Sequence, residues 1–303
     1  MKFFLKQFLY FITPILVILF ILELSLNNCN TTMKQKATFL NNNAKLINIL
    51  ILGNSHAGDG VDPSQFDYFT FNIANPNQSL FYDIEIVKKY FNRMVNLKYV
   101  IISVDYHSLY YQYCKEREFM YSTYFKIDYL PAGIKKHILL YNYGLKTSIN
   151  LLLSSPTNVG KGWRYVEGTN YKSLTSLKGK IRVNWFNEII DNNILEREKI
   201  LTNLEEFILF LKNRNVEPII LTLPCHKFCT NKLSNIIINS NKKDIKYLCD
   251  RYKIKSIYFL NKEFSDSLFF DVDHLNKNGA SFISKMINDS IIKYERTKYN
   301  HPY

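Results

Sequence analysis

Two short motifs, far apart in the chain, carry residue types that could act together in acyl transfer. The first is Gly53-Asn54-Ser55-His56, which follows the apolar, strand-forming run at 47–52. The second is Asp271-Val272-Asp273-His274, close to the other end of the chain. A serine hydroxyl is a weak nucleophile until a neighbouring base takes its proton, and the base works best when a third group orients it. Together the motifs supply a nucleophile, a base and an orienting carboxylate.

Each motif also has a purely structural interpretation. The glycine permits a sharp turn after the strand, which would present the Ser55 hydroxyl at the top of a sheet, but Ser55 could equally be a helix N-cap. Asp271 and Asp273 could be turn residues, with Asn276 capping the last helix and His274 only solvated. Taken alone, each motif favours the structural interpretation. Their presence in one chain favours the chemical one.

The two motifs, with Leu-Asn-x-x-Gly-Ala after the histidine, resemble those of the SGNH/GDSL hydrolase superfamily. Within it, the likeness is to the membrane-anchored branch that handles acyl groups on cell-surface polymers, the AlgJ/AlgX-like and DltD-like proteins. It covers roughly residues 46–105 and 196–292. The resemblance implies a flavodoxin-like three-layer α/β domain. It also implies Ser55 as nucleophile, His274 as general base and Asp271 as its orienting carboxylate.

The resemblance further implies an oxyanion hole. In the family, the loop after the second strand carries a glycine whose N–H joins this hole, and Asn77 holds that place here. Asparagine tolerates left-handed backbone angles, so its N–H can still be offered, although an ordinary Asx turn explains the loop equally well. We place Gly53 with Asn77 among the oxyanion or substrate-binding positions.

A third oxyanion donor is in doubt. The family often supplies an asparagine after the third strand, where this chain has Val104-Asp105-Tyr106-His107-Ser108. A negatively charged Asp105 would repel an oxyanion, so it must point away, pair with a base or bind substrate. His107 or Ser108 are the alternatives as donors, and the sequence favours neither.

The elements around these motifs alternate as in a parallel α/β sheet. Apolar runs predict strands at 47–52, 68–74, 99–104, 216–223 and 255–260. Helical periodicity predicts helices at 80–94, 196–213, 232–252 and 276–294. The fold class we expect is therefore a three-layer flavodoxin-like SGNH hydrolase fold with a central parallel sheet, an N-terminal transmembrane helix and an aromatic-rich insertion.

The N-terminus predicts a membrane anchor. Residues 3–24 are almost entirely apolar, and about 20 such residues span a bilayer as a helix. A cleaved signal peptide is the alternative, but the segment lacks a small-x-small cleavage site, and Asn27-Asn28 before Cys29 argues against a lipoprotein. We expect four parts, with the third outside the cytoplasm: an anchor at 1–26, a polar tether at 27–45, a catalytic domain at 46–294 and a polar tail at 295–303.

Residues 106–195 interrupt the alternation and are rich in Tyr, Phe and Trp. An insertion at the carboxyl edge of a parallel sheet lies over the site where such folds bind ligands. Its aromatic rings could stack on sugars or form a core of their own. We expect most of them to be core and two or three to touch substrate.

The segment Cys225-His226-x-x-Cys229 follows the fourth strand. Three possible ligands at this spacing match known zinc patterns poorly, so we expect no metal and no cofactor. A local disulfide between Cys225 and Cys229 is possible outside the cytoplasm. His226, at a strand end, is a predicted substrate contact, and Cys114 and Cys249 are expected to be buried.

Composition limits the classes of partner. At 47% hydrophobic and 21% charged residues the chain is globular rather than disordered. The net charge of +13 would attract an anionic partner, but the basic residues are spread out as codon bias would spread them. Since no run resembles a nucleic-acid arm, we expect no nucleic acid partner.

These observations predict a serine esterase or O-acyltransferase acting through an acyl-enzyme on acyl esters, most simply acetyl, of a cell-surface polysaccharide in the periplasm or cell exterior. The resemblance suggests a multi-span membrane acyltransferase as a partner. The main alternative is a catalytically silent SGNH-like scaffold that binds glycan or that membrane partner. A basic domain that binds acidic polymers by charge alone is a third, and would lose its binding in salt.

Overall fold

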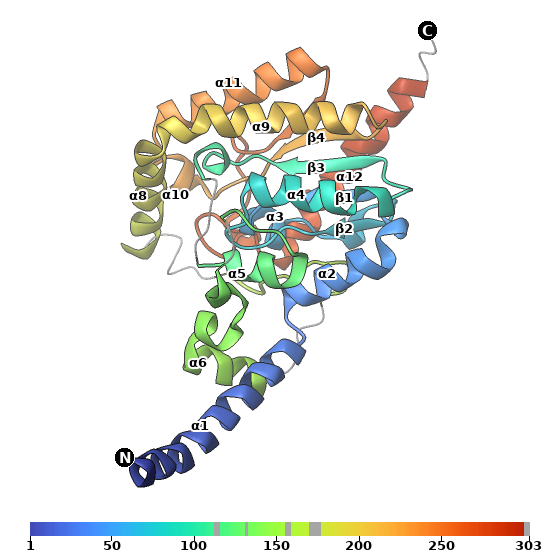
Figure 1. Ribbon diagram of the computed structural model, residues 1–303. Coiled ribbons are helices and arrows are strands. Elements are labelled where there is room, and N and C mark those ends of the chain that lie inside the picture. The colour runs from blue at the N-terminus through green and yellow to red at the C-terminus, as the bar shows by residue number, and fades with distance from the viewer. Residues whose placement is uncertain (112–115, 131–132, 155–158, 170–176, 300–303) are drawn as a thin grey trace. The chain divides into compact units, whose positions relative to one another are not determined.

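The computed structural model describes the chain except for the segments 112–115, 131–132, 155–158, 170–176 and 300–303 (Figure 1). It forms two compact units. The first, which we call the anchor unit, comprises Met1–Ala37 and Lys115–Asn158. The second, the sheet unit, comprises Thr38–Cys114 and Val159–Tyr303. Each unit is described by itself.

The sheet unit is built on five parallel strands in the order β2-β1-β3-β4-β5. They are β1 (Ile49–Leu52), β2 (Thr70–Asn72), β3 (Tyr99–Ser103), β4 (Glu217–Thr222) and β5 (Lys255–Tyr258). The strands are continuous apolar runs, as expected where both faces of a sheet are covered. This strand order is that of flavodoxin-like folds, so the predicted fold class is confirmed.

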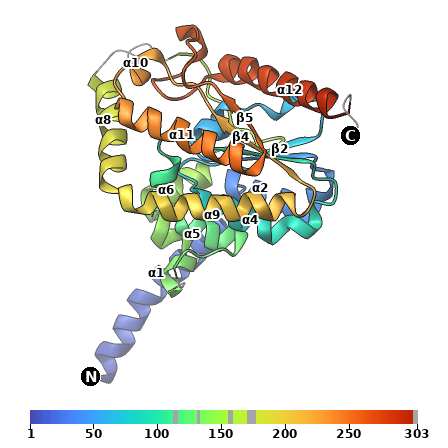
Figure 2. The ribbon, with the colours of Figure 1, turned by 90° about the horizontal axis from the view of Figure 1, so that it is seen from above.

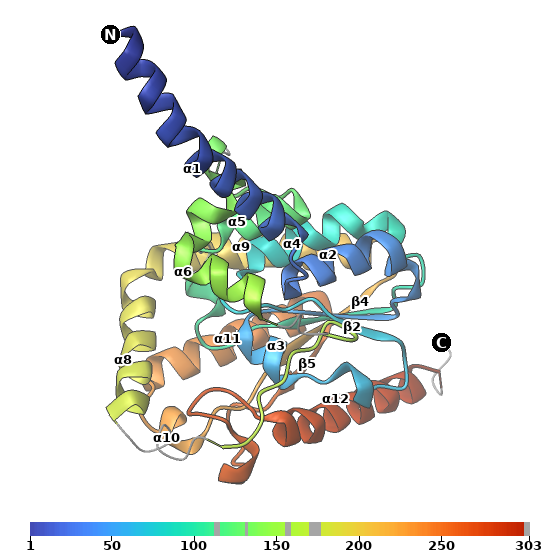
Figure 3. The same cartoon turned by 90° about the horizontal axis from the view of Figure 1, so that it is seen from below.

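Helices cover both faces of this sheet (Figures 2 and 3). On one face lie α4 (Leu80–Tyr90) and α9 (Ile194–Lys212), with α11 (Asn235–Tyr252) beside α9. On the other lie α3 (Ser55–Gly60) and α12 (Lys277–Tyr299). Ile283, Ile287 and Ile291 of α12, one turn apart, pack against the alternate strand residues Ile49 and Ile51 in one buried cluster. The result is the expected three layers.

The topology brings the candidate residues to one edge. All five strands are parallel, so the loops that follow them leave from the same carboxyl edge. β1 lies between β2 and β3, and the chain runs outward from it in both directions. Crevices at such a switch point are where open α/β sheets bind ligands. The Ser55 motif follows β1 at this point.

Two segments differ from the prediction. The expected polar tether at 27–45 is largely helical, with α2 at Thr32–Asn43 followed by a short 3-10 turn at Ala44–Leu46. Its few apolar side chains pack inward: Leu40 and Ala44 are buried, and Phe39 stacks on Phe71 at 4.1 Å between ring centroids. At the other end, α12 continues to Tyr299, five residues beyond the predicted Tyr294.

The insertion at 106–195 is divided between the units. Residues 115–158 belong to the anchor unit, with α5 (Glu118–Met120), a π-helical turn (Tyr121–Phe125), a 3-10 turn (Ile134–His137) and α6 (Leu139–Leu153). Residues 106–114 and 159–195 belong to the sheet unit, and the second of these segments includes α8 (Leu177–Asn192). Buried rings are common in both parts, as expected of core aromatics: Tyr110, Phe119, Tyr121, Phe125 and Phe186. Cys114, Tyr113 and Tyr171 lie outside the described residues.

The anchor unit begins with α1 (Lys2–Asn28), a helix with a mean hydropathy of 2.4 over its most apolar stretch. It is long and apolar enough to cross a membrane, as an anchor or a signal sequence would be, and only 6% of that stretch is buried. Near its carboxyl end, Leu26 packs with Phe119 of α5 and Leu139 of α6 in a small apolar cluster. α6 therefore lies against α1.

Candidate active site

Ser55, His274 and Asp271 form one hydrogen-bonded chain. The Ser55 Oγ lies 2.9 Å from His274 Nε2. The other ring nitrogen, Nδ1, lies 3.0 and 3.1 Å from the two carboxylate oxygens of Asp271. With a proton on Nδ1, the ring donates to Asp271 and accepts from the serine hydroxyl. The structure thus brings together the three residues that the sequence predicted to act together.

The turn that presents Ser55 follows from its sequence. Gly53 has φ +136°, and a Cβ there would lie 2.6 Å from the Cβ of Ser103, so only glycine fits this close approach. The Asn54 side chain accepts a hydrogen bond from His56 N at 2.8 Å and caps α3. Ser55 is therefore the first residue of the helix, where backbone N–H groups have no intrahelical acceptor.

The loop that carries His274 is held by its own backbone. Asp271 Oδ1 accepts hydrogen bonds from the backbone N–H of Asp273 at 3.1 Å and of His274 at 2.8 Å. Phe270 N donates to His274 O at 2.9 Å, closing the loop. Asn276 Oδ1 accepts from Gly279 N at 3.0 Å, so Asn276 does cap α12. Asp271 thus acts as a turn residue and Asn276 as a helix cap in the same loop that positions the His274 ring.

The environment of His274 suits a general base. Burial alone would lower its pKa, but the carboxylates of Asp273 and Asp271 outweigh burial and raise it above the ordinary value of 6.5. A base with a raised pKa takes a proton from a hydroxyl more readily, and Asp271 stabilises the imidazolium that results. Ser55 is therefore placed to attack an electrophilic carbon while passing its proton to Nε2.

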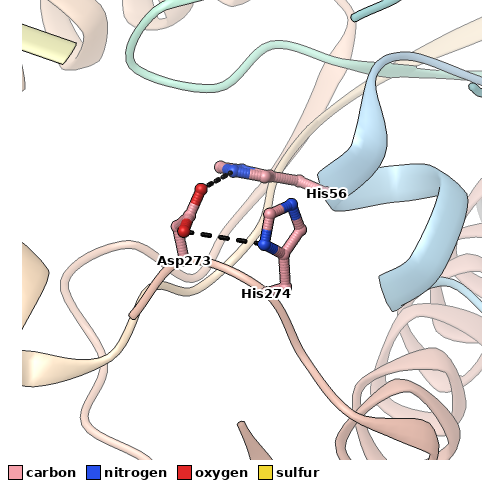
Figure 4. Close-up of side chains that lie close together, drawn as sticks. All are labelled: His56, Asp273 and His274. Atoms are coloured by element: carbon pink, nitrogen blue, oxygen red, sulfur yellow. Dashed lines mark hydrogen bonds and ion pairs between the residues drawn. The ribbon is translucent and has the colours of Figure 1, made fainter. Parts of the chain in front are cut away.

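A second histidine, His56, lies beside His274 and Asp273 (Figure 4). Its Nε2 lies 3.3 Å from Asp273 Oδ2, and its Nδ1 lies 3.4 Å from Asp105 Oδ2. The His56 and His274 rings meet edge to face, 5.3 Å apart between centroids. Burial lowers the pKa of His56, but the two carboxylates, led by Asp105, outweigh burial and raise it to about 10. His56 is thus a buried imidazolium at neutral pH.

Asp273 lies between both histidines and an arginine. Arg182 of α8 donates to Asp273 Oδ2 from Nε at 3.0 Å and from a terminal guanidinium nitrogen at 2.8 Å. Asp273 Oδ1 lies 3.6 Å from His274 Nδ1. Burial would raise the pKa of Asp273, but His274, Arg182 and His56 outweigh burial and hold it well below 3.8. A carboxylate expected only as a turn residue is therefore the centre of the charge network.

The structure answers the question about Asp105: it pairs with a base. Besides His56, its carboxylate accepts from Ser103 Oγ at 3.2 Å and from Leu223 N at 3.3 Å. Burial would raise the pKa of Asp105, but the charge of His56 outweighs it and the pKa is lowered. Ser108 Oγ accepts from Asp105 N at 2.9 Å, so it serves this loop. The negative charge of Asp105 is thus balanced within the network.

His107 is the other residue of the altered third-strand block. Asn54 Nδ2 donates to its Nε2 at 3.1 Å, so the ring proton lies on Nδ1. Burial, with the charge of His56, lowers the pKa of His107 to about 3, which leaves the ring neutral. His107 therefore orients the asparagine that precedes the serine.

The predicted oxyanion positions behave differently from one another. Asn77 has φ +57° and is the third residue of a turn that begins at Asn75, with Pro76 second and a hydrogen bond from Gln78 N to Asn75 O at 3.0 Å. A type II turn requires positive φ at its third position, which explains how asparagine serves where the family has glycine. Asn77 is exposed, and its role as a donor stays a prediction.

The N–H of Gly53 is not available to an oxyanion. It donates to Asp83 Oδ1 at 3.0 Å, and the same oxygen accepts from Gln78 Nε2 at 2.6 Å. The part Gly53 plays in the site is instead the turn itself.

His226 supports the His274 loop. It is 3% exposed, its Nδ1 accepts from Phe228 N at 3.2 Å, and its Nε2 lies 3.1 Å from Asp266 Oδ1. Its backbone N–H donates to Val272 O at 3.1 Å. The ring is buried and contacts Asp266, and its role as a substrate contact stays a prediction.

The cysteines of the Cys-His-x-x-Cys segment are free. Cys225 and Cys229 are both buried, and the Tyr106 hydroxyl lies 4.0 Å from Cys229 Sγ. The possible disulfide between them is not formed in this structure. Cys249 is also free, and it is partly rather than wholly buried.

Among the described residues, His56, Asp273 and His274 have ligating atoms within 4.8 Å of one another, close enough to hold a metal ion. The ring nitrogens of these histidines already pair with Asp105, Asp273, Asp271 and Ser55. Asp273 also forms an ion pair with Arg182. The positive charges of this guanidinium and of the His56 imidazolium would repel a divalent cation. The donor set fits a hydrogen-bonded network better than a metal.

Sequence reasoning missed His56 and Arg182. His56 belongs to the Gly-Asn-Ser-His motif, but consecutive residues on a helix point in different directions, so the motif did not indicate a role for His56 beside that of Ser55. The available signal was Asp105, a charged residue at a buried strand end that required a cation nearby. Arg182 lies in the insertion, where no pattern set it apart from other basic residues.

Comparison with known proteins adds little to this geometry. No family model and no curated protein sequence matches the chain. Among solved structures, a Bacteroides fragilis protein assigned as an acylhydrolase is 11% identical, with a TM-score of 0.44 over 84% of this chain and 95% of its own. A Bacteroides thetaiotaomicron GDSL-like lipase is 10% identical, with a TM-score of 0.44 over 86% and 99%. A Streptococcus pneumonia protein assigned as a platelet activating factor is 11% identical, with a TM-score of 0.43 over 93% and 98%. Likenesses this distant carry no argument about function, which must come from the site.

Proposed function

We propose that this protein is a serine hydrolase or acyltransferase of the SGNH type, acting on an ester bond through Ser55, His274 and Asp271. The observation that carries the proposal is the chain of contacts at 2.9 Å from Ser55 Oγ to His274 Nε2 and at 3.0 Å from Nδ1 to Asp271. This is the order of nucleophile, base and orienting carboxylate that acyl transfer needs.

The reaction has two halves. In the first, Ser55 Oγ attacks the ester carbonyl, His274 takes the hydroxyl proton, and the backbone N–H groups of Ser55 and Asn77 hold the oxyanion. The protonated His274 then gives its proton to the leaving alcohol, which leaves an acyl-enzyme. In the second half, His274 takes a proton from water or from a sugar hydroxyl, and that oxygen attacks the acyl group. The bond between Ser55 Oγ and the acyl carbon then breaks, and His274 returns its proton to Ser55 Oγ. Hydrolysis and transfer thus share every protein group.

The substrate we propose is an acyl ester, most simply acetyl, on a cell-surface polysaccharide, with α1 as an uncleaved anchor and the site outside the cytoplasm. The resemblance of the motifs to the AlgJ/AlgX-like and DltD-like branch supports this, and it also suggests a multi-span membrane acyltransferase as partner. Trp185 and Tyr165 of the sheet unit are 40% and 46% exposed and could stack on sugar rings.

The test is labelling of the full chain in detergent with a fluorophosphonate probe, which reports an activated serine without the natural substrate. Ser55→Ala and His274→Ala should each abolish labelling. Ser64→Ala is the matched control, because Ser64 is an exposed serine that lies outside the network. Labelling that survives in Ser55→Ala would refute the proposed nucleophile. A folded wild-type chain that takes no label would favour the silent glycan-binding scaffold.

A further inference from the structure

The second half of α6 carries an exposed apolar stripe. Leu145, Ile149 and Leu153 are 58%, 42% and 81% exposed, and their spacing of four residues places them along one side of a helix. The helix is interrupted before them, at Gly144, whose φ is +71°. Residues 145–153 are therefore a separate helical stretch with its own orientation.

The other sides of this stretch are different in character. Ser148 is buried, and Leu151 and Leu152 pack against the cluster formed by Leu26, Phe119 and Leu139. The third side is polar and exposed: Lys146, Thr147 and Asn150. The stretch thus has one side on the protein, one apolar side and one polar side, which is the pattern of a helix at a lipid–water interface.

Contacts with α1 hold the first turn of α6 beside Glu23, close to the carboxyl end of α1. The Glu23 carboxylate of α1 accepts hydrogen bonds from the backbone N–H of Leu139 and of Leu140, each at 2.8 Å. A carboxylate from one helix therefore caps the first turn of the other, where the backbone N–H groups otherwise lack acceptors. The adjoining cluster of Leu26, Phe119 and Leu139 fixes the two helices further.

The length of α1 gives the depth of Glu23, and so of the start of α6, in the bilayer. Residues 3–22 precede Glu23 without a break in the helix apart from the proline at position 14, and at about 1.5 Å per residue they span about 30 Å, the thickness of the hydrocarbon layer. Glu23 falls at the far boundary of that layer, where a carboxylate is tolerated. α6 begins at this boundary because Glu23 caps it.

We infer that residues 145–153 lie in the interface of the bilayer that α1 crosses, with Leu145, Ile149 and Leu153 turned toward the acyl chains and Lys146 toward the headgroups. The inference rests on the proposed anchorage by α1. Lipid then covers both the exposed apolar surface of α1 and the exposed apolar stripe of the neighbouring helix α6. Burial of such a stripe among acyl chains is favourable because it removes apolar surface from water without ordering a partner protein.

Tryptophan fluorescence in bilayers tests this inference. The full chain, with Trp163→Phe and Trp185→Phe, is reconstituted into phosphatidylcholine and phosphatidylglycerol vesicles whose lipids are brominated at the middle of the acyl chain. Ile149→Trp places the only tryptophan on the stripe. Thr147→Trp is the matched control, since position 147 lies about 160° around the helix from position 149.

We expect bromolipid to quench the fluorescence of Ile149→Trp at least about three-fold more than that of Thr147→Trp, as interfacial depth predicts. Equal quenching would overturn the inference, whether water, the sheet unit or a protein partner covers the stripe. Leu145→Trp is a second variant on the stripe, since position 145 also lies about 160° around the helix from position 147, and circular dichroism checks that each variant is folded.

Flotation and labelling distinguish failure of the membrane anchorage, of the interfacial position of α6 and of the proposed reaction. If the wild-type chain does not float with the vesicles after a carbonate wash, the anchorage itself is refuted and the inference falls with it. If it floats and the two tryptophans are quenched equally, only the interfacial position of α6 is refuted. Fluorophosphonate labelling of Ser55 reports the proposed reaction independently of either result.

Discussion

Two histidine–aspartate pairs lie side by side in this site, and they differ in what surrounds them. The side chains of His274 and Asp271 are 15% and 24% exposed, and the second ring nitrogen of His274 meets a serine hydroxyl. Those of His56 and Asp105 are 2% and 1% exposed, and the second nitrogen of His56 meets another carboxylate. One histidine can exchange a proton, whereas the other holds it. Residue type alone does not decide which role a histidine takes.

The largest expected effect comes from breaking the first pair. Ser55→Ala or His274→Ala should lower kcat for p-nitrophenyl acetate hydrolysis by about 10⁴- to 10⁶-fold, as removal of a nucleophile or base does in serine hydrolases. The double variant should be no worse than either single one, because the two residues act as a unit. Additive losses would mean that they act separately.

A smaller effect is expected when the orienting carboxylate of each pair is replaced. Asp271→Asn should reduce kcat by up to about 10⁴-fold, because the amide can favour the wrong ring tautomer of His274. Asp105→Asn is the matched change in the second pair and should reduce it far less, since Asp105 touches no reacting atom. Similar losses in both variants would show that the two pairs cannot be told apart in function.

Replacing His56 should affect stability more than chemistry. His56→Gln leaves Asp105 and Asp273 buried with one cation fewer, and loss of one partner from a buried ion pair costs about 3–5 kcal/mol. Denaturant unfolding of the full chain in detergent measures this free energy. The double variant His56→Gln/Asp105→Asn restores the balance of charge and should recover part of the loss. A double variant as unstable as the sum of the two single ones would argue against the pairing.

The pH dependence of stability should follow His56. Its pKa is about 10 in the folded chain and ordinarily 6.5, so its contribution is complete below pH 6.5 and is lost as the pH rises toward 10. The unfolding free energy of the wild type should therefore fall over this range relative to that of His56→Gln. A constant difference between the two proteins would contradict the raised pKa.

The pH dependence of activity should follow His274. Only its neutral form accepts the serine proton, so kcat/KM should rise with pH through a pKa above 6.5. The positive charge of His56 holds this pKa down, so His56→Gln should shift the rising limb to higher pH, by up to about one unit for a single nearby charge. An unshifted limb would show that the two rings are not coupled.

The sequence was most informative where geometry follows from the chain itself. The strand–glycine–serine turn and the Asp-x-x-His loop are local motifs, so both were found. The alternation of strands and helices predicted a parallel sheet, and its flavodoxin-like arrangement was expected from the resemblance. Helix α2 was missed because its polar composition concealed the few apolar side chains that pack inward, such as Phe39, which stacks on Phe71 of β2. The Arg182–Asp273 contact was missed because the chain separates its partners by 91 positions. Tertiary contacts of this kind have no local pattern.

The shared acceptor Asp83 has a consequence for how the site moves. One carboxylate oxygen near the start of α4 accepts hydrogen bonds both from the turn that presents Ser55, through Gly53, and from the loop that carries Asn77, through Gln78. The two halves of the proposed oxyanion hole are thus fastened to the same atom of the same helix. Because both contacts end on one oxygen of Asp83, we expect a displacement of α4 to move both segments in the same direction.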